Sequence, residues 1–191
     1  MASLFDARKV VSDAQLSLAV AAWQGYCSPS PLDLQAIVKG ETGALPFLKN
    51  ALLAHLARFP SVRNGLGRVE NQALKLINDG PREFTRLFQE FGKREAVYGL
   101  GDFQFWNELK RMAKAPTPLL VIKGADLDDG LASGAFLKAV LELTADGASV
   151  LEGKADFVGL NGIDLWLGGV HLSGAETLWR WDAENEVLIQ D

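Results

Sequence analysis

The sequence predicts an α+β fold that is mainly α: an N-terminal helical layer packed on a winged helix-turn-helix with a C-terminal β-hairpin. Apolar residues recur at helical spacing through most of the chain up to residue 113. Two short apolar segments, 119–122 and 137–143, then have the composition of strands. Three helices followed by two strands is the order of a winged helix, and alternating residues near the C-terminus predict further strands.

The bulk composition is that of a globular protein, with 48% hydrophobic and 23% charged residues among 191. No apolar run approaches the roughly 18 residues of a membrane span, so no membrane partner is expected. The first residues lack the apolar segment of a secretory signal, and Cys27 is the single cysteine. These features predict a cytoplasmic protein.

The net charge of −5 is unevenly distributed. Residues 68–123 carry 10 Lys and Arg against 7 Asp and Glu, whereas residues 124–191 carry 3 against 13. Because affinity for nucleic acid comes largely from phosphate neutralisation, only the middle of the chain is suited to it.

Three helices are expected before Pro60. Ser12 and Gln15 have capping-box spacing, so the first helix begins there and continues to about Tyr26. Its apolar residues at i, i+3, i+4 and i+7 are expected to form the inner face: Leu16, Ala19, Val20 and Trp23. The second helix starts with Pro31 in its first turn.

The winged-helix domain is expected over residues 64–157. Its three helices are predicted over 69–78, 82–91 and 103–113. Asp102 is the expected N-cap of the third helix, and Thr144 that of a short helix over 145–151.

Residues 1–63 are then an N-terminal helical subdomain, and residues 158–191 a C-terminal β extension. In the extension, strands flank Gly168 and Gly169, and a hairpin places Trp179 and Trp181 on one side. The linker at 60–67 is short, so one compact body is expected.

Three phrases of the sequence resemble the C-terminal region of bacterial proteins grouped as domain of unknown function 1835. They are FPSVRNGLGR at 59–68 with Glu70, LNGIDLWLGGVHL at 160–172 and LWRWD at 178–182. LTADGASVLEG at 143–153 also resembles the passage from wing to last helix in bacterial winged-helix regulators. The resemblance covers nearly all of the chain and implies the fold but no activity. Longer members carry another α/β domain first, so the chain is expected to be a fragment or a short member.

The third helix of the predicted winged helix has residue types that reach DNA bases and phosphates. They are Gln104, Asn107, Lys110, Arg111 and Lys114. The alternative is an ordinary solvated helix face. Phe103, Phe105 and Trp106 favour burial of this helix against a neighbouring layer.

Two Gly-rich phrases carry more polar residues than core packing requires. Together they contribute Arg63, Asn64, Arg68, Asn161, Asp164, Trp166 and His171. If the phrases meet, this cluster could hold a small anionic ligand. An ion pair of Arg63 or Arg68 with Asp164, which would fix the tail to the linker, is the favoured interpretation.

No catalytic or metal-binding motif is present, so no enzyme, no cofactor and no metal site are expected. His55 lies in an apolar helical stripe and is expected to be a packed core residue.

The favoured function is a protein-interaction or regulatory module, with a protein partner or self-association through the third helix or the hairpin. A sequence-specific DNA-binding transcriptional regulator and a small anionic-ligand sensor are the alternatives. If the basic residues of the helix at 102–114 are paired with Asp or Glu, the protein-interaction module is favoured. If they form a continuous positive face, DNA binding is favoured.

Overall fold

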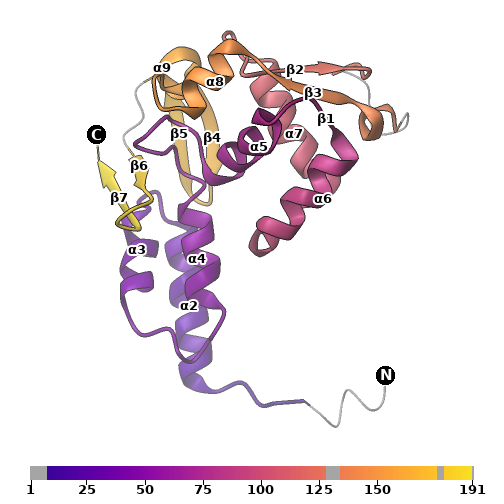
Figure 1. The fold of residues 1–191 in the computed structure, drawn as a ribbon. Helices are drawn as coiled ribbons and strands as arrows, with labels where there is room; N and C mark the ends of the chain where they lie inside the picture. Colours follow the sequence, from indigo (N-terminus) through magenta and orange to yellow (C-terminus); the bar gives the residue numbers. More distant parts are fainter. Residues whose placement is uncertain (1–7, 128–133, 176–178, 191) are drawn as a thin grey trace.

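Apolar side chains gather into two separate cores. The computed structural model describes residues 8–127, 134–175 and 179–190 (Figure 1). The central helices and a small sheet make the first core, from residues 66–157. The N-terminal helices and the C-terminal hairpins make the second, from residues 34–59 and 167–188. The chain is α+β and mainly α, as predicted.

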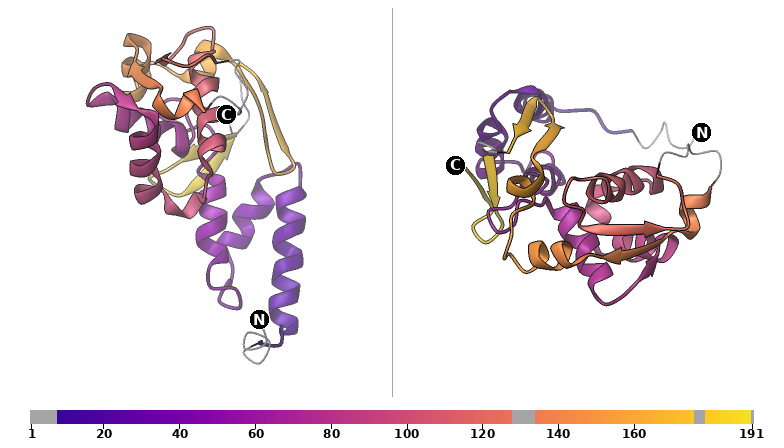
Figure 2. Two further views of the ribbon diagram at one scale, coloured as in Figure 1. Left: turned by 90° about the vertical axis from the view of Figure 1, so that its right-hand side faces the viewer. Right: turned by 90° about the horizontal axis from the view of Figure 1, so that it is seen from above.

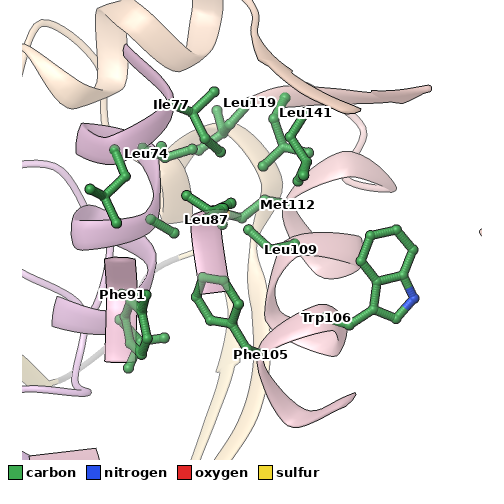
Figure 3. Packing of buried hydrophobic residues seen from close by; sticks show 14 of the residues in the cluster. Leu74, Ile77, Leu87, Phe91, Phe105, Trp106, Leu109, Met112, Leu119 and Leu141 are labelled. Atoms are coloured by element: carbon green, nitrogen blue, oxygen red, sulfur yellow. The ribbon is translucent and has the colours of Figure 1, made fainter. Parts of the chain in front are cut away.

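Three amphipathic helices and one 3-10 turn build the first core. They are α5 (Arg68–Asn78), α6 (Phe84–Arg94), η1 (Ala96–Tyr98) and α7 (Asp102–Ala113). Each helix directs one apolar face inward, where Leu74, Leu87 and Leu109 have no exposed surface (Figure 3). Gly101 rather than Asp102 is the N-cap of α7, because the Gln104 side chain bonds the Gly101 amide.

A three-stranded antiparallel sheet lies against these helices. Its strands are β1 (Arg82–Glu83), β2 (Leu120–Lys123) and β3 (Val140–Leu143), in the order β1-β3-β2. The expected pairing of the two strands after α7 is confirmed, with Leu120 opposite Leu143. Arg82 was expected to start a helix, but it pairs with β3 instead, and the 3-10 turn η3 (Ala135–Lys138) occupies the start of the predicted second strand.

Two short helices close this part of the chain. Thr144 caps α8 (Ala145–Leu151) through a hydrogen bond from the Gly147 amide, as predicted. α9 (Phe157–Asn161), capped by Asp156, lies where only strands were expected.

Helix α2 (Asp13–Cys27) has the predicted capping box but not the predicted inner face. Residues Ala22 and Gly25 are buried, while Leu16, Val20 and Trp23 are 59%, 47% and 65% exposed. A Cβ atom at Gly25 would lie 3.1 Å from Ile37 Cδ1, so the glycine lets α3 (Leu32–Lys39) approach closely. The small residues of α2, not its large ones, therefore meet the neighbouring helix.

Two separate β-hairpins complete the second core with α3 and α4 (Leu48–Leu56). They are β4 (Ile163–Leu167) with β5 (Val170–Gly174), and β6 (Trp179–Asp182) with β7 (Val187–Gln190). The buried side chains of α3 and α4 cluster with those of the hairpins, not with the central helices against which they were expected to pack. Figure 2 shows α2 at the outer edge of the group of N-terminal helices, away from the central body.

The turn between β4 and β5 touches the end of α2. The Gly169 amide donates a 2.8 Å hydrogen bond to the Tyr26 carbonyl. Gly168 has a φ of 63°, and a Cβ atom there would lie 2.3 Å from the same oxygen. The expected tight bend at these glycines is thus also a contact with α2.

Candidate functional site

The cations of α7 are mostly occupied by contacts within the protein. Nη2 of Arg111 pairs with Oε1 of Glu70 and lies 3.3 Å from Oε2 of Glu108. The Arg111 guanidinium also lies over the ring of Phe157. Of the residues expected to contact DNA, Arg111 is therefore part of an ion network at the edge of the first core.

Glu70 is the buried carboxylate of that network, with only 6% of its surface exposed. Burial raises the pKa of the Glu70 carboxyl above its ordinary value of 4.5, and the Arg111 guanidinium offsets part of this shift. Arg58, from the end of α4, reaches Glu108 at 3.9 Å. The network thereby connects the first core to the N-terminal helices.

The other expected DNA contacts differ in their accessibility. Lys110 is half-buried, with its ammonium 5.6 Å from the centre of the Phe103 ring. Gln104 is exposed but caps the helix, while Asn107 and Lys114 are exposed. Of the acidic residues in the β2–β3 connection, Asp126 is exposed, and Asp128 and Asp129 lie outside the described residues.

The first Gly-rich phrase forms a structural junction between α5 and α8. Asn64 is 1% exposed, and its amide donates to Asn71 at 2.8 Å and to the Val150 carbonyl at 3.0 Å. Nη2 of Arg63 lies 3.4 Å from the Glu152 carbonyl. Nε of Arg68 lies 2.9 Å from Oε2 of Glu95.

The second Gly-rich phrase makes contacts of its own. Asn161 accepts a 2.6 Å hydrogen bond from the Thr117 amide. On the β4–β5 hairpin, Asp164 lies 2.8 Å from Nε2 of His171, whose ring stacks on Trp166 with centroids 4.4 Å apart. Trp166 is 62% exposed, so this group lies on the surface.

The expected ion pair of Arg63 or Arg68 with Asp164 is replaced by other partners. Among the described residues, Arg68 pairs with Glu95 and Asp164 with His171. The linker is instead joined to the tail by two backbone hydrogen bonds, from the Val62 amide to the Trp181 carbonyl and from the Trp181 amide to the Pro60 carbonyl. The linker thus contacts the tail at β6, whereas the expected ion pair would have joined it to Asp164 of the second Gly-rich phrase.

A cavity of about 450 Å³ lies beside this junction, between the two cores. Its lining comes from α4, the linker, α5, Glu95 and the β6–β7 turn. Arg63 and Arg68 of the predicted polar cluster lie on its wall, whereas Asn161, Asp164 and His171 do not.

The outer face of α2 is the feature that the sequence interpretation missed. Its side chains Leu16, Val20 and Trp23, which we call the outer face, were assigned to the core but lie exposed. No residue of α2 after Asp13 is charged. That absence of charge was the signal available in the sequence, because a helix apolar all round is normally covered on every side.

His55 packs between Tyr26 of α2 and Phe59, with ring centroids 5.0 and 6.3 Å apart. Burial, with a smaller contribution from Arg58, lowers the pKa of the His55 imidazole to about 4. The residue is neutral at pH 7, in keeping with the packed role expected from its apolar stripe.

Within the described ranges, no group of three or more His, Cys, Asp or Glu side chains is placed to hold a metal ion. Over the same ranges, no helix has the length and apolar character needed to cross a bilayer.

Comparison with protein-family models, curated proteins and solved structures found no match to this chain. The resemblance to domain of unknown function 1835 therefore stays a prediction.

Proposed function

We propose that this chain is a non-enzymatic protein-interaction module that self-associates through the outer face of α2. Residues 64–157 form its winged-helix body in this proposal. The order α5, β1, α6, α7, β2, β3 and the sheet order β1-β3-β2 support that assignment. The cytoplasmic location and the domain boundaries expected from the sequence stay predictions.

The uncovered outer face of α2 carries the proposal. From their exposed fractions, Leu16, Val20 and Trp23 leave on the order of 300 Å² of apolar surface uncovered. Contiguous apolar patches of a few hundred Å² on a monomer commonly mark binding sites. A standard interface covers about 800 Å² on each partner, of which about 450 Å² is apolar, so this face supplies roughly two thirds of the apolar share of one interface.

A second copy of the chain is the occupant that fits this face best. Because α2 has no charged side chain from residue 14 to residue 27, two copies of the face meet without like-charge repulsion. A partner with a charged helix would have to bury its charges against Trp23 without an ion-pairing group on α2.

The spacing along α2 is suited to antiparallel pairing about a twofold axis. With the axis between Ala19 and Val20, Leu16 of one copy faces Trp23 of the other. The small Ala19 then faces the larger Val20, so the two surfaces interlock. The dimer expected through the aromatic third helix is not favoured, because Phe105 and Trp106 are buried.

Solution mass tests self-association most simply. The unmodified protein is expected to have twice its chain mass of 20.7 kDa by sedimentation equilibrium, and Trp23→Ser is expected to be a monomer. Trp166→Ser is the matched control, since Trp166 is 62% exposed and Trp23 65%, and it should remain a dimer. A monomeric unmodified protein, or equal dissociation of both variants, would contradict the proposal.

Sequence-specific DNA binding is the second candidate, favoured by the exposed Asn107 on α7 and the exposed Lys114 at its C-cap. The pairing of Arg111 with two carboxylates counts against it, because duplex binding would have to break that network. We expect no salt-sensitive mobility shift of duplex DNA at low ionic strength. A shift abolished by Asn107→Ala and Lys114→Ala together would establish the DNA function instead.

A further inference from the structure

The β4–β5 hairpin is a two-stranded sheet of its own, and Figure 2 shows it along one outer side of the molecule. Its two-residue turn makes Leu167 and Val170 a hydrogen-bonded pair. Bonded and non-bonded pairs alternate along antiparallel strands, so the next pair, Trp166 and His171, exchanges no backbone hydrogen bond. The amide and carbonyl groups of Trp166, and of Asp164 two residues earlier, therefore point away from β5.

The outward backbone groups of β4 have no partner among the described residues. No hydrogen bond within these ranges reaches the main-chain amide or carbonyl of Asp164 or Trp166. Edge strands are usually protected by lysine, proline or a bulge, but β4 contains neither residue and pairs with β5 without a bulge. An unprotected edge of five residues can accept a strand from another molecule.

The same two residues carry the exposed side chains of β4. Trp166 is 62% exposed, and its indole stacks on the His171 ring with the centroids 4.4 Å apart and the planes 3° apart. This stacking covers one face of the indole and holds the ring in place. An exposed aromatic ring in a fixed position is typical of the residues that dominate the binding energy of protein interfaces.

Asp164 adds a negative charge beside this ring. Its Oδ1 atom lies 2.8 Å from Nε2 of His171, so the one imidazole contacts both the carboxylate and the indole. The Asp164 side chain is 84% exposed, and no lysine or arginine of the described residues pairs with it. Because an arginine side chain is both cationic and planar, it suits a site that offers an aromatic ring and a carboxylate together.

We propose that β4 binds an extended peptide segment of a partner protein, which adds a strand to the outward edge and places an arginine against Trp166 and Asp164. Paired residues share a face of a sheet, so the partner residue opposite Trp166 has its side chain on the exposed face. The residues next to this arginine lie on the other face, beside the partly buried Ile163 and Leu165, and are apolar. The proposed self-association is independent of this site, since β4 contributes nothing to the outer face of α2.

An NMR titration of the ¹⁵N-labelled full chain with the peptide acetyl-Thr-Val-Arg-Val-Thr-amide tests the proposal. Amide shifts are expected along β4, and the amides of Asp164 and Trp166 should exchange more slowly with solvent. Glutamine in place of the arginine of the peptide should weaken binding by about fivefold or more. A peptide with every backbone amide methylated keeps its side chains but cannot donate to β4, so it should not bind.

Variants of the protein locate the two side-chain contacts. Trp166→Ser should weaken peptide binding about tenfold or more. Asp164→Asn can still bond to His171 but should reduce the preference for arginine over glutamine in the peptide about twofold or more. Trp23→Ser alters a side chain of similar exposure and should leave the affinity unchanged, so failure of the α2 dimer leaves this result interpretable.

Four outcomes would each overturn the assignment. They are no measurable binding, equal binding of the methylated peptide, equal affinity for the arginine and glutamine peptides, and amide shifts centred on His171 and Ser173 of β5.

Discussion

Helices α2 and α7 each carry a tryptophan at helical spacing with other apolar residues, yet Trp106 of α7 is 2% exposed and Trp23 of α2 is 65% exposed. The difference lies in the polar residues. On α7 the charged and amide side chains occupy one side, so only the apolar side can be buried. On α2 almost every side is apolar, so the packing of the neighbouring helix determines which side is buried. α3 packs on Ala22 and Gly25 because the small residues allow close approach, which leaves the large side chains outside.

The largest expected effect concerns the ion network of α7. Arg111→Met leaves the buried Glu70 without its partner and should lower the free energy of unfolding by about 3–5 kcal/mol at pH 7. Since the folded state then holds the Glu70 proton more tightly than the unfolded chain, stability should fall as pH rises above 4.5.

Urea unfolding above and below pH 4.5 measures both effects. Arg111→Met with Glu70→Leu is the matched control and should recover much of the lost stability. A single variant as stable as the unmodified protein would mean that Arg111 is free for another role, and the argument against DNA binding would weaken.

A Leu→Ala substitution on each helix compares the contribution to stability of the buried face of α7 with that of the exposed face of α2. Leu109→Ala on α7 creates a cavity in the first core and should cost about 2–5 kcal/mol. Leu16→Ala on α2 should change the unfolding free energy of the monomer by less than about 0.5 kcal/mol. Urea unfolding at low protein concentration checks both, and comparable losses would show that the Leu16 side chain is covered within one chain.

Acidification should loosen the attachment of α2 to α4. The pKa of His55 is about 4 in the folded protein and 6.5 in the unfolded chain, so the unfolded state takes up the proton first. The stability that depends on neutral His55 is complete above pH 6.5 and is lost as pH falls towards 4, by up to about 3 kcal/mol.

His55→Phe should remove that dependence while keeping the ring between Tyr26 and Phe59. Thermal unfolding of both proteins between pH 6.5 and 4 compares them. Parallel pH profiles would show that other groups cause the acid sensitivity.

The elements of this fold could largely be predicted from the sequence, because local signals determine them. The capping box at Ser12, the Thr144 cap and the strand segments after α7 were all interpretable from neighbouring residues. The two-residue strand β1 was not, since only its pairing with the distant β3 makes it a strand.

The candidate sites were less predictable, because they depend on contacts between distant segments. Residue type indicated that Arg68 and Asp164 would find charged partners, but not that these would be Glu95 and His171. The prediction of the inner face of α2 was wrong for a different reason. Because α2 has no charged residue after Asp13, the spacing of its apolar residues does not indicate which side of the helix is buried.

The distance between the two copies of Cys27 in solution tests the α2 pairing most directly. Cys27 is the single cysteine and is exposed at the end of α2, so a nitroxide label can be attached without substitution. For antiparallel helices centred between Ala19 and Val20, helix rise and packing distance place the two Cα atoms about 24 Å apart. Electron–electron double resonance should show one intermolecular distance consistent with that separation. Absence of an intermolecular distance, or a separation near the roughly 10 Å of parallel helices, would contradict the account.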